Sequence, residues 1–318
     1  MNEQSCNGGP GGETARRAAD HQALEERMGL IDEKLLVLSG KGGVGKSTVA
    51  ANLALTLARE GRRVGLLDVD LHGPSIPKLL GLEGRRVHEH DGALRPVHGP
   101  AGVQVVSVGF LMPSENDALV WRGPRKYALI RQFLTQVAWG ALDYLVIDAP
   151  PGTGDEPMAV AEMARPNAAA ILVTTPQALA TADVRRSVAF CRLLELRILG
   201  IIENMSGLVC PDCGRTLDLF GTGGGRQLAT SMALPFLGAI PIDPEIVIRG
   251  DRGQPLMETA AGDPSSRAFA DLAERILFTR GMAATPTADL LGEGAEGHQP
   301  PAPATDPSDH DPEPDHAP

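Results

Sequence analysis

The fold of this chain is decided by Ser39-Gly40-Lys41-Gly42-Gly43-Val44-Gly45-Lys46-Ser47-Thr48. This stretch fits the P-loop pattern, in which a glycine, four further residues and Gly-Lys precede a serine or threonine. A buried strand is predicted before it at residues 35–38, and a helix is predicted after it at residues 49–58, ending near Gly61. Strand, glycine-rich turn and helix therefore follow in the order that a phosphate-binding site requires.

The residue types in this loop suit a nucleotide. Glycines allow positive φ, so that backbone N–H groups can point inward, and the helix N-terminus adds partial positive charge. Lys46 is expected to neutralise charge on the β- and γ-phosphates, and Ser47 to hold Mg²⁺. The residues predicted to bind the nucleotide here are Gly40, Lys41, Gly42, Gly43, Val44, Gly45, Lys46, Ser47 and Thr48.

Lys41 adds a second cation that the binding of one nucleotide does not require. In this respect the loop resembles the deviant Walker A loop of the SIMIBI ATPases, the class of nitrogenase iron protein, MinD and ParA. In that class the early lysine reaches the nucleotide of a partner subunit. The resemblance therefore implies a homodimer that holds two ATP molecules at its interface, with Lys41 and Lys46 both catalytic.

Three aspartates end predicted strands beside the P-loop strand. Asp68 and Asp70 follow the apolar run 64–67, and Asp148 ends the run 144–147, as in a Walker B strand. Asp70 is predicted to orient the attacking water, while Asp68 and Asp148 are predicted to lie in the Mg²⁺ shell. The Pro150-Pro151-Gly152 turn that follows is suited to sensing the γ-phosphate.

The remaining pattern predicts an α/β fold of the P-loop NTPase class. Apolar runs at 168–174, 198–202 and 236–240 are further buried strands, and helices are expected near 181–194 and 265–280. Short alternating pieces between residues 79 and 108 suggest a hairpin and one more strand. We expect a mostly parallel sheet of about seven or eight strands with helices on both faces.

Three residues after the last strands are candidates for binding the base. Asn204 follows the strand at 198–202 and could hydrogen-bond a purine edge, while Pro241 and Asp243 lie in a rigid turn at the edge of the crevice. The sequence contains no Asn-Lys-x-Asp motif of the kind that reads guanine. ATP is therefore favoured over GTP.

Cys210-Pro211-Asp212-Cys213-Gly214 interrupts the alternation of strands and helices. Such a turn points two sulfurs at one ion, but two thiolates complete neither a tetrahedral zinc site nor an iron–sulfur cluster with four ligands. Two such turns facing each other across a twofold axis would supply four sulfurs. Motif chemistry leaves a shared [4Fe–4S] cluster, a zinc ion across the dimer, a redox pair and an unligated turn as alternatives. Cys191, inside a predicted helix, is expected to be a small core residue.

Composition limits the other classes of function. The chain has 318 residues, 42% of them hydrophobic, and a net charge of −11. Residues 281–318 contain eight acidic residues and no Lys or Arg, so removing that −8 leaves about −3 and no basic footprint for nucleic acid. No apolar run of about eighteen residues predicts a membrane span, and residues 1–12 lack a signal-peptide core. We therefore expect a cytoplasmic protein that binds neither nucleic acid nor membrane.

Three segments are predicted along the chain. Residues 1–33 are a flexible polar leader with one helical patch at residues 14–28. Residues 34–280 form the ATPase domain with a Cys-x-x-Cys insertion near 206–220, and residues 281–318 are a disordered acidic tail rich in proline.

Taken together, these motifs resemble the Mrp/ApbC family of P-loop ATPases, the iron–sulfur cluster carriers. The resemblance covers about residues 28–280 and is specific, because the Trp-Arg-Gly-Pro segment and the Asn-Met-Ser-Gly and Cys-Pro-x-Cys-Gly combination are not features of MinD or ParA. The stretches that carry it are 41–48, 68–75, 121–126, 148–155, 204–214 and 240–244.

The resemblance implies a homodimer that binds ATP and Mg²⁺. It also implies a labile [4Fe–4S] cluster held by Cys210 and Cys213 of both subunits, received from a cluster donor and passed to apo-proteins. Some eukaryotic relatives carry an N-terminal four-cysteine site, whereas Cys6 stands alone here. A positioning ATPase of the MinD or ParA kind and a zinc-bridged, nucleotide-dependent adaptor are the alternative functions.

Overall fold

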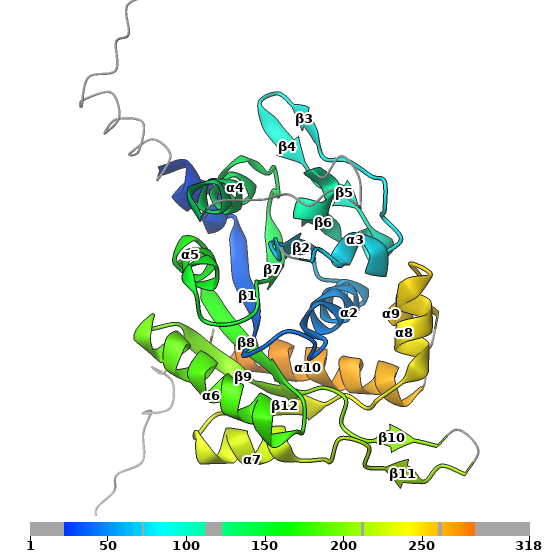
Figure 1. Cartoon of the computed structure of the whole chain (residues 1–318). Coiled ribbons are helices and arrows are strands. Elements are labelled where there is room, and N and C mark those ends of the chain that lie inside the picture. The colour runs from blue at the N-terminus through cyan, green and yellow to red at the C-terminus, as the bar shows by residue number, and fades with distance from the viewer. Residues whose placement is uncertain (1–21, 72, 112–122, 211–212, 260–262, 284–318) are drawn as a thin grey trace, which may run out of the picture.

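A computed structural model of the chain describes residues 22–71, 73–111, 123–210, 213–259 and 263–283. The strands of its central sheet are β1 (Ile31–Ser39), β2 (Val64–Asp68), β5 (Val97–His98), β6 (Gln104–Ser107), β7 (Leu142–Asp148), β8 (Ala168–Thr174), β9 (Arg197–Glu203) and β12 (Phe236–Ala239). Within the described residues they lie in the order β12-β9-β8-β1-β7-β2-β6-β5 (Figure 1). Neighbouring strands are parallel except for β5 with β6. The predicted α/β fold with a mostly parallel sheet is confirmed.

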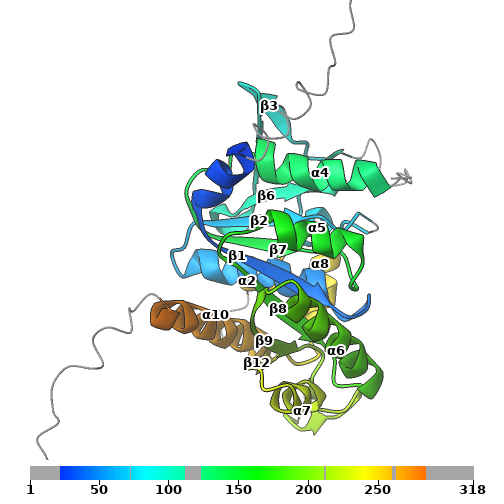
Figure 2. The ribbon, with the colours of Figure 1, turned by 90° about the vertical axis from the view of Figure 1, so that its left-hand side faces the viewer.

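Helices cover both faces of this sheet, which explains why the central parts of its longer strands are continuous apolar runs. The helices are α2 (Lys46–Arg59), α3 (Ile76–Leu79), α4 (Gly123–Gln136), α5 (Asp155–Met163), α6 (Ala178–Leu193), α7 (Gly224–Ser231), α8 (Pro244–Asp251), α9 (Leu256–Thr259) and α10 (Pro264–Ala283). Buried residues of α4, α5, α6 and α7 share one core cluster, and those of α2, α9 and α10 share the other. Figure 2 shows α4, α5 and α6 in front of the strands.

Two short antiparallel hairpins extend from this framework. One pairs β3 (His88–His90) with β4 (Ala93–Arg95), as the alternating pattern between residues 79 and 108 predicts. The other pairs β10 (Leu208–Val209) with β11 (Thr216–Leu217) and encloses the two-cysteine turn. Figure 1 shows this second hairpin projecting away from the helices and the sheet.

The N-terminal boundary of the fold differs from the prediction. Residues 22–29 are helical, which overlaps the helical patch expected at residues 14–28, but β1 begins at Ile31, before the predicted strand at 35–38 and within the expected leader. Met28 and Ile31 are fully buried in the core, so apolar packing anchors this part of the chain. The flexible leader predicted for residues 1–33 is therefore wrong for residues 22–33, and residues 1–21 lie outside the described residues.

At the C-terminus, α10 ends at Ala283, slightly beyond the predicted helix. The acidic tail lies outside the described residues from 284 onward, and its separation from the ATPase domain stays a prediction. Trp121 and Arg122, quoted above for the family resemblance, also lie outside them. None of the described helices combines the length and the apolar character needed to cross a membrane.

Candidate functional site

The P-loop connects the end of β1 to the start of α2. Gly43 and Gly45 have φ values of 80° and 81°, in the left-handed region that favours glycine. A Cβ atom at Gly45 would lie 2.2 Å from Nδ2 of Asn204, so this position also lacks space for a side chain. Gly45 directly precedes α2, and its carbonyl accepts the hydrogen bond of Val49 N–H at 3.0 Å. The N-terminal N–H groups of α2 are thus available to an anion.

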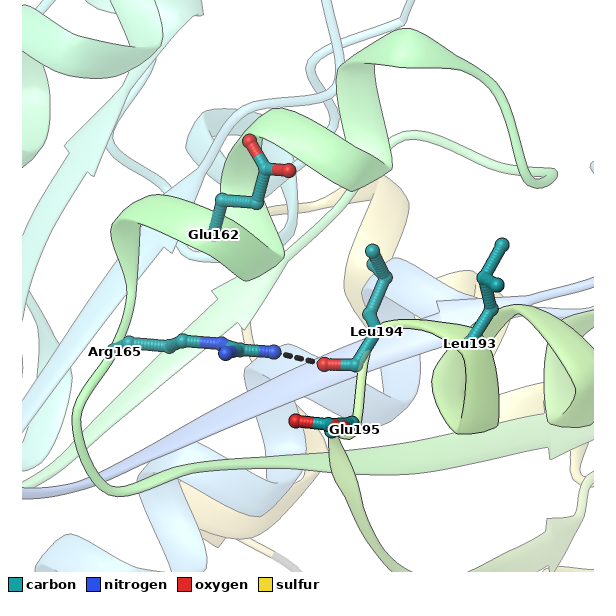
Figure 3. Close-up of a pocket in the computed structure, with 5 residues that line it drawn as sticks. All are labelled: Glu162, Arg165, Leu193, Leu194 and Glu195. Atoms are coloured by element: carbon teal, nitrogen blue, oxygen red, sulfur yellow. Dashed lines mark hydrogen bonds between the residues drawn. The ribbon is translucent and has the colours of Figure 1, made fainter.

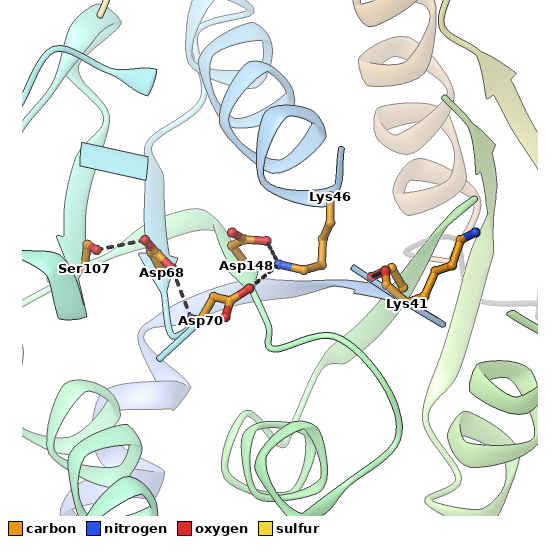
Figure 4. Close-up of polar contacts among 7 residues, drawn as sticks. Lys41, Lys46, Asp68, Asp70, Ser107 and Asp148 are labelled. Carbon is orange, nitrogen blue, oxygen red and sulfur yellow. Dashed lines mark hydrogen bonds and ion pairs between the residues drawn. The ribbon is translucent and has the colours of Figure 1, made fainter. Parts of the chain in front are cut away.

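Lys46 lies among carboxylates at the carboxyl edge of the sheet (Figure 4). Its ammonium is 2.5 Å from Oδ1 of Asp148 and 3.5 Å from Oδ2 of Asp70, and its side chain is 6% exposed. The cation therefore lies between two carboxylates in a nearly dry site. Phosphate oxygens entering this site would meet a preformed positive group.

Asp148 is fully buried, and burial is the main reason that its pKa is raised; the side chains of Lys46 and Ser47 oppose this shift. Its Oδ2 has no hydrogen-bond partner among the described residues. A buried carboxylate oxygen without a donor, beside a serine hydroxyl, is the kind of oxygen ligand that a hard divalent cation takes. Asp148 and Ser47 thus fit Mg²⁺.

Asp68 has a different environment. Its Oδ2 accepts a hydrogen bond from Ser107 Oγ at 2.8 Å, and its Oδ1 accepts one from the backbone N–H of Asp70 at 3.1 Å. Burial, and next the negative charge of Asp148, raise the pKa of Asp68 to about 8. Asp68 therefore holds the backbone of Asp70 in position, and its predicted place in the Mg²⁺ shell stays a prediction.

Sequence reasoning missed Ser107 in this arrangement. Ser107 is the last residue of β6 and is paired in register with Asp68 at the end of β2. A hydroxyl ending the neighbouring apolar strand was the available signal. It became informative only once β6 was known to lie beside β2.

Lys41 lies apart from this cluster. Its carbonyl accepts a hydrogen bond from Ser39 Oγ at 3.0 Å, while its side chain is half-buried. Figure 4 shows its ammonium pointing away from Lys46 and Asp148. Across the described part of the chain, no acidic group is recorded as an ion-pair partner of this ammonium.

The predicted base-binding residues have roles in this structure already. Asn204 is buried and donates from Nδ2 to the carbonyl of Val44 at 2.9 Å, so it holds the backbone of the P-loop. Asp243 accepts the backbone N–H of Glu245 at 2.9 Å and so caps α8. Pro241 comes two residues after the end of β12. Contact with an adenine stays a prediction for all three.

The two-cysteine turn is a compact knuckle at the tip of the β10–β11 hairpin. Cys210 N–H donates to the Arg215 carbonyl and Gly214 N–H donates to the Cys210 carbonyl, both at 2.9 Å. Gly214 has φ 69°, which the return of the backbone requires. Cys213 is exposed and Cys210 is half-buried. Among the described residues, no group of three or more His, Cys, Asp or Glu side chains could hold a metal ion.

The other two cysteines are separate from this turn. Cys191 is buried in α6, and burial raises the pKa of its thiol to about 12, so it is a core residue as predicted. Cys6 lies outside the described residues.

A surface depression lies at the opposite edge of the sheet, where α5 and α6 end (Figure 3). It is lined by Glu162, Arg165, Leu193, Leu194 and Glu195. The Arg165 guanidinium donates to the Leu194 carbonyl across it. None of the predicted site residues lines this depression, so it has no part in the nucleotide site.

Comparisons with known proteins identify a family of P-loop NTPases. The family described as "ParA: NUBPL iron-transfer P-loop NTPase" matches residues 30–277. The cytosolic Fe-S cluster assembly factor NUBP2 of Homo sapiens is 50% identical over 247 residues, which are 76% of this chain and 91% of that protein. The iron-sulfur cluster carrier protein of Saccharolobus solfataricus is 43% identical over 254 residues, 80% of this chain and 86% of that protein.

Solved structures show the same fold. A nucleotide-binding protein from Archaeoglobus fulgidus, in complex with ADP, is 41% identical with a TM-score of 0.68, and the match covers 78% of this chain and 96% of that one. The cell division ATPase MinD of Pyrococcus furiosus is 25% identical with a TM-score of 0.59, covering 78% and 99%. Of these two proteins, the one from Archaeoglobus fulgidus is more similar to this chain in both sequence and structure.

Proposed function

The chain belongs to the family of NUBPL iron-transfer P-loop NTPases, and from this premise we propose that it binds and hydrolyses ATP while it carries an iron–sulfur cluster to apo-proteins. One observation carries the proposal. A two-cysteine knuckle projects from the same edge of the sheet as a complete P-loop, and the described residues offer it no further metal ligand. Relatives named as assembly factors and carriers of iron–sulfur clusters support this reading.

The cluster is the cargo, and we propose that two chains hold it between them. Cys210 and Cys213 of each chain supply two thiolates, so a homodimer supplies the four that a [4Fe–4S] cluster requires. Exposure of Cys213 suits a cluster that must be received from a donor and released to an apo-protein. The Lys41 ammonium points away from Asp148 of the same chain, and we propose that it reaches the partner's nucleotide.

Hydrolysis follows from the buried cluster of charges. Lys46 and the loop N–H groups stabilise the charge of the transferred phosphoryl group, and Asp70, held by Asp68, orients the attacking water. Asp148 and Ser47 hold Mg²⁺, which supplies positive charge to the phosphate oxygens when bound. We propose slow turnover, because the sequence shows no evident arginine finger.

The proposed location is the cytosol, the compartment named for the NUBP2 relatives. The nearly balanced charge of residues 1–280 gives no reason to propose a nucleic-acid partner. We propose no membrane partner either, because the acidic sequence after residue 280 has no basic amphipathic character.

Anaerobic reconstitution tests the proposal. Iron, sulfide and mass by light scattering should give about four irons and four sulfides per two chains, with visible charge-transfer absorption. The Cys210→Ala/Cys213→Ala variant should lose both iron and sulfide, whereas Cys6→Ala, the matched control, should retain them.

Other results would favour the alternatives. Zinc without sulfide would indicate the zinc-bridged adaptor, and ATP-dependent co-sedimentation with lipid or DNA would indicate a positioning ATPase. Iron content that is unchanged in the double cysteine variant would contradict the assigned ligands.

A further inference from the structure

Glu203 ends β9 directly before the cysteine hairpin, and its carboxylate is buried with 1% exposure. Three donors surround it. Ser206 Oγ donates to Oε1 at 2.5 Å, Gly223 N–H donates to Oε1 at 2.8 Å, and Gly225 N–H donates to Oε2 at 2.5 Å. Both of its oxygens accept hydrogen bonds, so the side chain is held in one position.

These donors lie on both sides of the hairpin. Ser206 comes just before β10, while Gly223 and Gly225 come after β11 and begin α7. A single carboxylate therefore closes the two ends of the segment that carries Cys210 and Cys213. Gly225 fits closely, because a Cβ atom there would lie 3.0 Å from Cβ of Glu203.

The next residue connects the same strand end to the P-loop. Asn204 Nδ2 donates to the Val44 carbonyl at 2.9 Å, and Asn204 N–H donates to the Thr174 carbonyl at 2.8 Å. Met205 then takes φ 57°, which is uncommon for a residue with a side chain and held here by its surroundings. Asn204 thus contacts the P-loop, while Glu203 beside it contacts both ends of the hairpin.

We propose that Glu203 is a positioning residue that couples the P-loop to the cysteine hairpin. A nucleotide that draws the loop N–H groups toward its phosphates shifts the Val44 carbonyl, and Asn204 passes this shift to Glu203. Because Glu203 holds both ends of the hairpin, the accessibility of the Cys210 and Cys213 sulfurs changes with nucleotide. This inference rests on the proposed function, in which the P-loop binds ATP and these cysteines hold the cluster.

Thiol alkylation of the reduced, cluster-free full chain tests this coupling. Rates of iodoacetamide labelling at Cys210 and Cys213 are read by peptide mass spectrometry, with and without Mg²⁺ and a non-hydrolysable ATP analogue. Nucleotide affinity is measured separately. Cys191, buried and with a pKa raised to about 12, is the internal reference that labels only when the chain unfolds.

In the wild type we expect the nucleotide to change the labelling rate by at least about threefold, equivalent to about 0.65 kcal/mol. In Glu203→Gln, which loses one acceptor oxygen, we expect the ratio to approach one while nucleotide affinity stays within about threefold. Glu33→Gln is the matched control. It alters another buried glutamate, near the opposite edge of the sheet and paired with Arg197, and should keep the wild-type ratio.

A purely structural Glu203 would change both rates equally and leave their ratio as in the wild type, which would overturn the inference. A wild-type ratio of one with normal nucleotide binding would overturn it as well, while leaving the proposed function intact. Absence of nucleotide binding would overturn both. If Glu203→Gln labels at Cys191, Ser206→Ala replaces it, and this variant should reduce the ratio by removing one donor at the start of the hairpin.

Discussion

The P-loop and the cysteine hairpin leave the same edge of one sheet, yet they differ in completeness. The P-loop groups come from three adjacent central strands and the helix that follows, and Lys46 forms ion pairs with both Asp148 and Asp70 inside one chain. The hairpin is two short strands with a cysteine exposed at its tip. Within the described residues, the groups proposed to bind the nucleotide lie together in one chain, whereas the hairpin carries two cysteines.

This difference has a physical origin. Strands in the middle of a large parallel sheet are covered on both faces, so a charge placed there must be paired or must bind an ion. An isolated two-stranded hairpin is marginally stable and depends on what holds its ends. Here Glu203 holds them, so the hairpin can present an exposed cysteine without a core of its own.

We expect the largest effect from removing the hairpin cysteines of one chain in a dimer. We predict that mixed dimers of wild-type and Cys210→Ser/Cys213→Ser chains, isolated through two different tags, lose the whole cluster, because two sulfurs cannot hold it. Wild-type dimers carrying the same two tags are the control, and iron and sulfide are counted in both. Half or full iron content in the mixed dimer would mean that each chain holds metal alone.

Lys46→Met tests the P-loop in the same way. We predict that ATP turnover falls by about 10²–10³-fold, because the cation that faces the phosphates is removed from a dry site. Steady-state phosphate release measures this loss. Lys78→Met, which alters an exposed lysine paired with Asp251, should change turnover by less than about twofold. Equal losses in the two variants would show that Lys46 has no special role.

Lys41→Ala tests whether the nucleotide site is complete in one chain for turnover as well as for binding. We predict at least about a tenfold loss of turnover with nucleotide affinity within about threefold, because the Lys41 ammonium points away from its own site. Thermal stability should not change. A matched fall in affinity at protein concentrations where the chain is monomeric would argue that Lys41 acts within its own subunit.

Lys34, near the amino edge of the sheet, provides a reference outside both regions. It is fully buried and donates to the carbonyls of Ile31 and Pro166, and burial lowers its pKa from 10.5 to about 8. Between these values the unfolded chain binds the additional proton, so stability rises with pH. We predict that the wild-type free energy of unfolding, relative to Lys34→Met, increases on the order of 1 kcal/mol from pH 8 to 9.5.

Urea unfolding at the two pH values measures this difference. The subtraction removes groups that titrate alike in both proteins, so the remaining change reports Lys34. A difference that stays flat or falls with pH would contradict a lowered pKa.

The sequence predicted the sheet, the P-loop and the strand-end aspartates because each depends on local pattern. Apolar runs of four or five residues, each followed by Asp or Glu, lie in β2, β7 and β9 of the structure. The start of β1 was missed for the opposite reason. Its residues 32–34 are all charged, and burial of Glu33 and Lys34 depends on partners at Arg197 and Pro166, far along the chain.

The same limit applies to the site. Lys46 and Asp148 could be assigned from motifs, whereas the support of Asp70 by Asp68 and Ser107 depends on which strands become neighbours. Glu203 was visible as an acidic residue at a strand end, but its role depends on Gly223 and Gly225, which return to it after a long excursion. Pairings between distant segments cannot be read from local periodicity.

Because the excursion between Ser206 and Gly223 begins and ends at one carboxylate, and Leu208 forms a bridge with Ile242, the base of this segment is held independently of the tip that carries the cysteines. Another tip of similar span could be transplanted there without shifting the register of any strand. The tip of the β10–β11 hairpin is therefore a position where a different metal-binding turn could be introduced.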